Sequence, residues 1–166
     1  MRFCDYIEKT YRLIYNKRIM SRCFAMLKPG VVNRRLVGEV ISRLEKKGMK
    51  IVGLKMVHPT EELAKTHYAE HEGKPFFNDL VSYLVSGPVI AMVLQADDAV
   101  ALTRKLVGKT NPSDAEPGTI RGDYCIHTNR NIIHASDSDE SAAREIKLWF
   151  KEEEIFDWPD CEDGWY

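Results

Sequence analysis

A histidine lies where a short apolar run meets a polar turn, within the stretch NIIHASDS at 131–138. The apolar run predicts the end of a buried strand, and the serines and the aspartate after His134 are typical helix caps. Such a junction holds the backbone rigid while the side chain faces a ligand. An imidazole placed there can act as a phosphoryl-accepting nucleophile. A lone histidine beside an apolar strand is more often structural, so the functional interpretation depends on its neighbours.

Glu145 lies about two turns into the helix that is expected after His134. If it faces the start of that helix, its carboxylate can accept a hydrogen bond from one imidazole nitrogen, which sets the tautomer and raises the nucleophilicity of the ring. Ser136 can hold the carboxylate in turn. The alternative for Glu145 is a solvated helix residue that pairs with Lys147 or Arg144.

Three cations have no obvious partner in the adjacent sequence: Lys28, Arg104 and Arg121. Phosphoryl transfer needs positive charge around the transferring oxygens, and arginine binds phosphate through two parallel N–H bonds. Each of these cations alone is most simply a surface charge, and their spacing does not show that they converge.

Motifs that bind nucleotides through a glycine-rich loop are absent, because neither GxxxxGK[ST] nor GxGxxG occurs. A nucleotide would therefore have to bind in another way. Phe76 offers a face for base stacking, although a Phe-Phe pair is by default part of a core. Thr110 and Asn111 offer a hydroxyl and an amide, although their default role is turn formation.

Apolar periodicity predicts the elements that must position these side chains. Strands are expected at 22–28, 50–58, 89–95 and 131–134. Helices are expected at about 36–48, 59–67, 75–85, 97–106 and 139–149, with Asp97 as a candidate cap of the fourth. Residues 108–130 are rich in Gly, Pro, Asn and Asp and predict a long irregular loop. This order fits an α+β, ferredoxin-like βαββαβ fold, with a four-stranded antiparallel sheet and helices on one face.

The whole chain has 166 residues, which suits one ordinary domain, and a net charge of −1, which gives no electrostatic basis for binding nucleic acid or an anionic membrane. Its four cysteines are scattered and suit a reducing compartment. The most apolar stretch, 80–94, is broken by Gly87-Pro88, so no membrane span is expected. A cytoplasmic location follows as the expectation.

Residues 1–20 form a basic extension with apolar residues near helical spacing, and residues 21–166 form the expected domain. A docked or frayed extension is the simpler interpretation, and a transit peptide, which would place the protein in an organelle, is the alternative. Met20 could also serve as a start. The acidic tail after Lys151 carries aromatic residues that should be buried on the body or on a neighbouring subunit: Phe156, Trp158, Trp165 and Tyr166.

From about Ser21 onward the chain resembles nucleoside diphosphate kinases. The matching stretches are RRLVGE at 34–39, KPFF at 74–77, SGPV at 86–89, TNP at 110–112, PGTIRGD at 117–123 and NIIHASD at 131–137. They occur in the order and spacing of that family, and the ordered set is far more specific than any one stretch.

The resemblance implies a ping-pong exchange. A nucleoside triphosphate, usually ATP, would phosphorylate Nδ1 of His134, and a nucleoside diphosphate would then take the phosphoryl group. Mg²⁺ would arrive mostly on the nucleotide phosphates, with no metal site built from protein side chains. The loop at 108–130 matches the family's loop at subunit contacts, and the aromatic tail resembles members that form hexamers. A homo-oligomer, with a hexamer as the expected assembly, follows.

Carried over residue by residue, the resemblance implies a catalytic set of His134, Glu145, Ser136, Tyr68 and Lys28. It implies a nucleotide-binding set of Lys28, Phe76, Arg104, Thr110, Arg121 and Asn131. Lys28 and Asn131 would contact the sugar hydroxyls, and Phe76 would stack on the base. The two arginines and Thr110 would hold the phosphates.

The sequence departs from the family pattern in three places. Gly30-Val31 follows Lys28-Pro29 where the family usually has Asp-Gly, so a permissive backbone position is expected to move to Gly30. Thr128 stands where an apolar residue often faces the base, which predicts weaker or wetter stacking. Ala135 follows His134 where glycine is commonest.

A non-enzymatic alternative is a ferredoxin-like module that binds nucleotides or proteins and has lost turnover. Loss of His134 or of the cations would have indicated it, and all of them are present. A nucleic-acid-binding protein is a third alternative, but the chain has no basic patch that would make nucleic acid its main partner.

Overall fold

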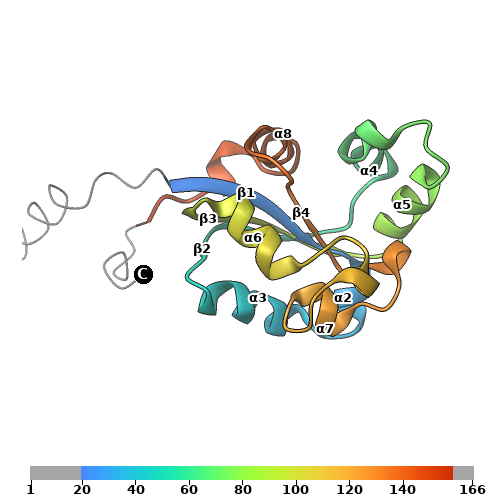
Figure 1. The fold of residues 1–166 in the computed structure, drawn as a ribbon. Coiled ribbons are helices and arrows are strands. Elements are labelled where there is room, and N and C mark those ends of the chain that lie inside the picture. The colour runs from blue at the N-terminus through green and yellow to red at the C-terminus, as the bar shows by residue number, and fades with distance from the viewer. Residues whose placement is uncertain (1–19, 159–166) are drawn as a thin grey trace, which may run out of the picture.

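The computed structural model describes residues 20–158. Its centre is a sheet of four strands, β1 (Met20–Leu27), β2 (Lys50–Val57), β3 (Val89–Asp97) and β4 (Ile133–Ala135). The strand order is β2-β3-β1-β4, and all neighbouring strands run antiparallel (Figure 1). This confirms the predicted four-stranded ferredoxin-like sheet. The predictions for the extension before Met20 and for Trp165 and Tyr166 lie outside the described residues.

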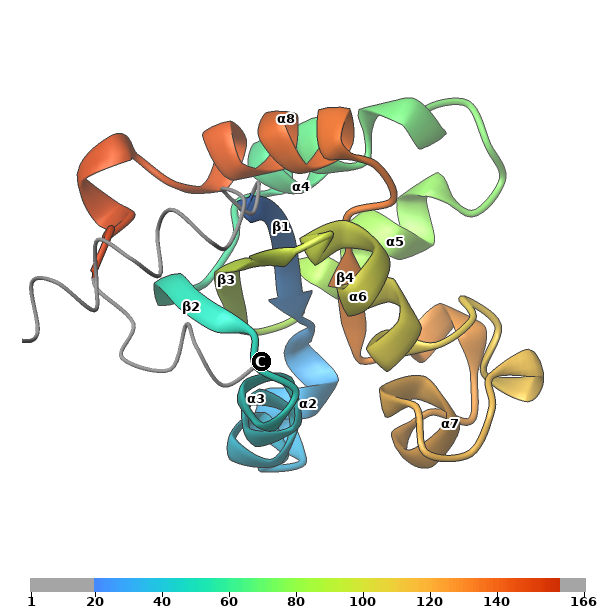
Figure 2. The ribbon, with the colours of Figure 1, turned by 60° about the vertical axis from the view of Figure 1, so that its left-hand side comes forward.

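Helices cover both faces of the sheet, so the expectation of helices on one face was wrong. One face carries α2 (Pro29–Asn33), α3 (Val37–Lys46), α6 (Ala99–Val107) and α7 (Ile120–Tyr124). The other carries α4 (Glu61–His67), α5 (Phe77–Leu84) and α8 (Asp139–Trp149), as Figures 1 and 2 show. Short 3-10 turns occupy Ala69–His71, Pro112–Asp114, Thr128–Arg130 and Glu152–Glu154.

Strand β1 separates two hydrophobic cores, because successive side chains of a strand point to opposite faces. Ala25 and Leu27 belong to the core under α3 and α6, whereas Phe24 and Met26 belong to the core under α4, α5 and α8. A central strand that is buried on both faces appears in the sequence as a continuous apolar run, which is why the run at 22–28 predicted this strand.

Local caps explain where several helices begin. Thr60 accepts the backbone N–H of Leu63 at the start of α4, and Ser138 accepts that of Ser141 at the start of α8. The predicted cap of α6 by Asp97 was wrong. That helix begins after Asp98, and the hydroxyl of Ser21 accepts the N–H of Ala99 at 2.7 Å.

The segment 108–130 is more ordered than the predicted irregular loop, because it contains α7. Thr119 caps this helix by accepting the N–H of Gly122. Arg43 of α3 forms an ion pair of 2.7 Å with Asp123 of α7, which ties the segment to the body. No helix within the described part of the chain is both long enough and apolar enough to cross a bilayer.

Candidate active site

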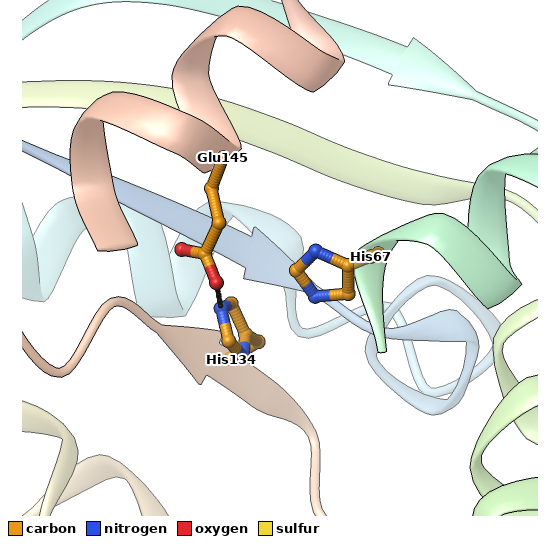
Figure 3. A group of neighbouring side chains, drawn as sticks. All are labelled: His67, His134 and Glu145. Atoms are coloured by element: carbon orange, nitrogen blue, oxygen red, sulfur yellow. Dashed lines mark hydrogen bonds and ion pairs between the residues drawn. The ribbon is translucent and has the colours of Figure 1, made fainter. Parts of the chain in front are cut away.

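His134 is the middle residue of β4, an edge strand of three residues that pairs with β1. Its neighbours Ile133 and Ala135 belong to the core under α3 and α6. Strand alternation therefore turns His134 to the opposite face, where it meets side chains from α8 and α4 (Figure 3). The imidazole is partly exposed, with 21% of its side chain open to solvent, so a ligand can reach it.

Glu145 lies on α8, and its carboxylate is 2.9 Å from Nε2 of His134. Ser136 donates its hydroxyl hydrogen to the other carboxylate oxygen at 2.6 Å. Only 3% of Glu145 is exposed, which rules out a solvated helix residue. Because the carboxylate accepts both bonds, the imidazole proton lies on Nε2, and Nδ1 is left with a lone pair.

Lys28 and Arg121, which are far apart in the sequence, lie close enough for their charges to interact, and Arg104 of α6 lies close enough to influence Arg121. Lys28 follows β1 and is 4% exposed, and Arg121 of α7 donates to the carbonyl oxygens of Gly108 and Ile133, each at 2.8 Å. Burial, and then the charge of Arg121, lower the pKa of Lys28 to about 8. Burial also lowers the pKa of Arg121 to about 10, with a contribution from Arg104.

Within the described residues, neither Lys28 nor Arg121 forms an ion pair with a carboxylate. Like charges that are buried together without a counter-ion are costly, and a polyanion that enters between them relieves that cost. This arrangement therefore favours the approach of an anion to Lys28 and Arg121.

Three buried side-chain atoms in the described part of the chain have no hydrogen-bond partner: Nε2 of His67, Nε of Arg121 and Oδ1 of Asn131. Unpaired buried polar groups are rare in folded proteins and require a reason. All three belong to residues around His134, so polar atoms without a partner in the described structure are concentrated in this region. Asn131 itself donates its amide N–H to the carbonyl of Thr128 at 2.9 Å.

The remaining predicted residues lie on the segments around this cluster. Phe76 is 47% exposed and offers an open ring face, and Thr110 is exposed beyond α6. The ring of Tyr68 neighbours both Lys28 and His67. Its centroid lies 5.8 Å from Nζ of Lys28 and 4.7 Å from the centroid of the His67 ring. Burial raises the pKa of Tyr68, so its hydroxyl stays protonated.

Gly30 was expected to adopt a backbone conformation that only glycine readily allows. This expectation was wrong, because Gly30 is a residue of α2 and has no positive φ. A β-carbon there would lie 2.7 Å from Oη of Tyr83, so close approach explains the glycine. Thr128 donates its hydroxyl hydrogen to Oδ1 of Asn111 at 2.8 Å, and its effect on base stacking stays a prediction. Ala135 is buried in β4 opposite Ala25.

Sequence reasoning missed His67, the last residue of α4, whose ring centroid lies 4.5 Å from that of His134. Ligand atoms of His67, His134 and Glu145 all lie within 4.8 Å of one another. These atoms do not form a ready metal site. The indole N–H of Trp149 lies 3.3 Å from Nδ1 of His67, which must accept it, so Nε2 carries a proton and has no lone pair for a metal.

Comparisons with known proteins agree with this geometry. The family model described as nucleoside diphosphate kinase matches residues 21–155. The chain belongs to the nucleoside diphosphate kinase family. The enzyme from Staphylococcus epidermidis is 56% identical over 146 residues, which cover 88% of this chain and 98% of the relative. The enzyme from Methanosphaera stadtmanae is 61% identical over 138 residues, which cover 83% and 91%.

A solved nucleoside diphosphate kinase from Halobacterium salinarum, in complex with CDP, superposes with a TM-score of 0.85 at 49% identity, covering 87% of this chain and 97% of that one. Nucleoside diphosphate kinases move a phosphoryl group between nucleotides with the help of a divalent metal ion. This chain is therefore a phosphotransferase that acts on nucleotides.

Proposed function

We propose that the enzyme works by a ping-pong exchange through a phosphohistidine at Nδ1 of His134. The observation that carries this proposal is the bond from His134 to Glu145, because it keeps the proton on Nε2 and the lone pair on Nδ1. Nδ1 attacks the γ-phosphorus of a nucleoside triphosphate. An N–P bond forms while the bond to the bridging β-phosphate oxygen breaks, and the diphosphate leaves. The next diphosphate attacks the phosphohistidine through its terminal oxygen, and Nδ1 regains its lone pair.

The charges around His134 support this chemistry. When Nδ1 binds phosphorus, the ring, which still holds its Nε2 proton, becomes cationic, and the Glu145 carboxylate stabilises that charge. Ser136 holds the carboxylate in place. On the side of the phosphates, Lys28, Arg104 and Arg121 supply the positive charge that balances the phosphoryl oxygens.

For nucleotide binding, we propose one shared site that both substrates enter in turn. Phe76 would stack on the base, Lys28 and Asn131 would bind the sugar hydroxyls, and Arg104, Thr110 and Arg121 would hold the phosphates. The exposed ring of Phe76 and the unpaired Oδ1 of Asn131 support these assignments. Stacking does not depend on base identity, so we expect broad base selectivity. The CDP complex of the Halobacterium salinarum relative is consistent with such a site.

The metal ion is proposed to be Mg²⁺, carried by the nucleotide phosphates. It prefers oxygen ligands, whereas the one group of three neighbouring candidate ligands in the described residues contains two imidazoles. The residues present therefore fit an ion that arrives with the nucleotide. When bound, it adds positive charge at the phosphate oxygens.

We propose a cytoplasmic homo-oligomer, with a hexamer as the expected assembly, in which residues 21–166 form the enzyme domain and residues 1–20 an extension. Exposed apolar side chains support self-association: Leu54 and Met56 are 52% and 62% exposed on the edge strand β2. In the tail, Phe156 and Trp158 are also exposed. The free thiols of Cys23 and Cys125 support a reducing compartment.

Brief incubation with γ-labelled ATP and Mg²⁺ tests the phosphohistidine. We expect label on the protein that is labile to acid and stable to alkali, and a chase with GDP should remove it as labelled GTP. His134→Ala should carry no label, whereas the exposed His58→Ala should carry the full amount. Label that persists on His134→Ala would overturn the assignment. Absence of label on the wild type would favour a binding module without turnover.

A further inference from the structure

His67 is a buried imidazole at the centre of a cluster of aromatic rings. It ends α4, is 4% exposed, and packs between α8 and the sheet. Its ring contacts those of Phe24, Tyr68, Trp149 and His134, with centroid distances of 5.9, 4.7, 5.7 and 4.5 Å. None of the roles derived above for the reaction uses it, although it is in contact with the proposed nucleophile.

Trp149 determines the tautomer of His67. An indole nitrogen can only donate a hydrogen bond, and Nε1 of Trp149 lies 3.3 Å from Nδ1 of His67. Nδ1 must therefore hold a lone pair, and the proton of the neutral ring lies on Nε2. A second proton on Nδ1 would place two N–H groups head to head and break this bond.

Among residues 20–158, the Nε2–H of His67 has no acceptor, although it is buried. Leaving a buried donor unpaired costs about 1–3 kcal/mol. The ring meets that of His134 edge-on, at an interplanar angle of 80°. Figure 3 shows an edge of His67 that carries nitrogen turned toward the His134 ring. An N–H placed over an aromatic face is a weak interaction that favours an uncharged or electron-rich ring.

His67 also has reason to stay uncharged. Burial lowers its pKa well below the ordinary value, and the nearby charges of His134, Lys28, Arg144 and His71 lower it further. The facing carboxylate, that of Glu145, is already engaged by His134 and Ser136. In the phosphorylated state the His134 ring is cationic, so a second cation in contact with it would oppose phosphoryl uptake.

We propose that His67 is a positioning residue for phosphoryl transfer: Trp149 holds it as an uncharged imidazole with its proton on Nε2, and this N–H edge fixes the plane of the His134 ring. The inference rests on the proposed phosphohistidine at His134. Glu145 holds the His134 ring at Nε2, and His67 packs against the face of that ring. Together these contacts keep Nδ1 of His134 pointing in one direction, toward the incoming phosphorus. A near-attack geometry of this kind contributes strongly to rate.

The test is the rate of phosphoenzyme formation in single turnovers with labelled ATP, measured across about pH 5 to 8. Trp149→Phe removes the donor that holds the proton of His67 on Nε2, so the ring can adopt either neutral tautomer and the rate should fall to about half or less. Burial still keeps the ring uncharged, so this loss should be the same at every pH in the range. In the His67→Gln background the same Trp149→Phe change has no imidazole tautomer to release and should lower the rate little. A rate in Trp149→Phe that matches the wild type, or an equal loss in the His67→Gln background, would overturn the proposal.

His67→Phe keeps a ring but removes the N–H, and should lower the single-turnover rate at least about tenfold at every pH, with KM for ATP little changed. His67→Gln keeps an uncharged N–H and should recover part of that loss. Equal rates for His67→Phe and the wild type contradict the proposal.

Nitrogen NMR of the imidazoles in the wild type gives a readout that needs no variant: the proton of His67 should lie on Nε2, and a proton on Nδ1 would overturn the assignment. Label on the wild type and none on His134→Ala tests the phosphohistidine separately.

Discussion

Ser136 donates its hydroxyl hydrogen to Oε2 of Glu145 across 2.6 Å, which leaves Oε1 of the same carboxylate to accept from His134. Ser136 also accepts the backbone N–H of Phe24 in β1, so the carboxylate is anchored to the centre of the sheet. A chain of bonds thus runs from the backbone of a buried strand to the imidazole. Its rigidity keeps the ring in one tautomer.

Glu145→Gln should lower kcat at least about tenfold, which is about 1.4 kcal/mol in the barrier, because a neutral amide stabilises the cationic ring less than a carboxylate does. Ser136→Ala should lower kcat less, since it loosens the carboxylate without removing it. Steady-state kinetics with ATP and a diphosphate measure both. Glu140→Gln, an exposed carboxylate on the same helix, is the control. An unchanged kcat in Glu145→Gln would remove Glu145 from the mechanism.

Much of the fold follows from local patterns. The bounds of α8 were predicted correctly, because Ser138 is a strong cap and the apolar face after it is regular. Helix α2 was missed, since a Pro-Gly pair after a strand usually signals a turn rather than five helical residues. The sequence predicted the helices of the second face. It did not predict which face of the sheet they cover, because that depends on how the chain crosses from strand to strand, and apolar periodicity carries no information about those crossings.

In the candidate site, too, local sequence patterns predicted some contacts and the tertiary fold determined the others. His134, Ser136 and Glu145 lie within one strand, turn and helix, so local spacing placed them together. Lys28 and Arg121 meet only because β1 pairs with β4 and the segment after α6 folds back, and without the family resemblance their convergence was unknown. His67 reaches His134 through the packing of α4 beside α8, and no spacing in the sequence signals such a contact.

Lys28 should make nucleotide binding sensitive to alkali. Its pKa is lowered to about 8, so it loses its charge as the pH rises through that value, and kcat/KM should fall by loss of one proton. Lys28→Arg should remove this alkaline limb, because a guanidinium stays charged. A limb that persists unchanged in Lys28→Arg would assign it to another group. Profiles of kcat/KM against pH provide the measurement.

The free energy of unfolding should rise with pH because of Lys28, whereas kcat/KM should fall. Between about 8 and its ordinary pKa of 10.5, the unfolded chain holds a proton on Lys28 that the folded chain has lost. Stability therefore rises with pH in this window as the buried charge disappears. The stability advantage of Lys28→Met over the wild type should be largest below about pH 8 and should shrink toward pH 10.5. Urea unfolding at fixed protein concentration measures it, and an advantage that grows with pH would contradict the burial argument.

Arg35 carries backbone strain just before α3, because its φ is +57° and it has a β-carbon. Arg35→Gly should raise the free energy of unfolding by about 1 kcal/mol, since relief of the left-handed conformation outweighs the added freedom of the unfolded chain. Arg35→Ala loses the same exposed side chain but keeps the strain, so it should give no gain. Urea midpoints distinguish the two, and equal midpoints would show that φ at this residue costs little.

Gly30 is held against Tyr83, whose hydroxyl oxygen accepts the N–H of Gly30 at 3.3 Å. A β-carbon at residue 30 would lie 2.7 Å from that oxygen, and Tyr83 is only 8% exposed, so its ring has little room to withdraw. Gly30→Ala should therefore cost about 1–3 kcal/mol of stability. Helix α2 begins directly after Lys28, so a displaced α2 should also raise KM for nucleotides more than it lowers kcat.

Tyr83→Phe provides the matched background for Gly30→Ala, because it removes the obstructing hydroxyl and keeps the ring. It loses one partly buried hydrogen bond, which should cost about 1 kcal/mol by itself. In this background the added cost of Gly30→Ala should shrink to less than half, and KM should return toward the wild-type value. A double-mutant cycle on urea midpoints measures this coupling. If Gly30→Ala costs the same in both backgrounds, the hydroxyl of Tyr83 is not what requires glycine at this position.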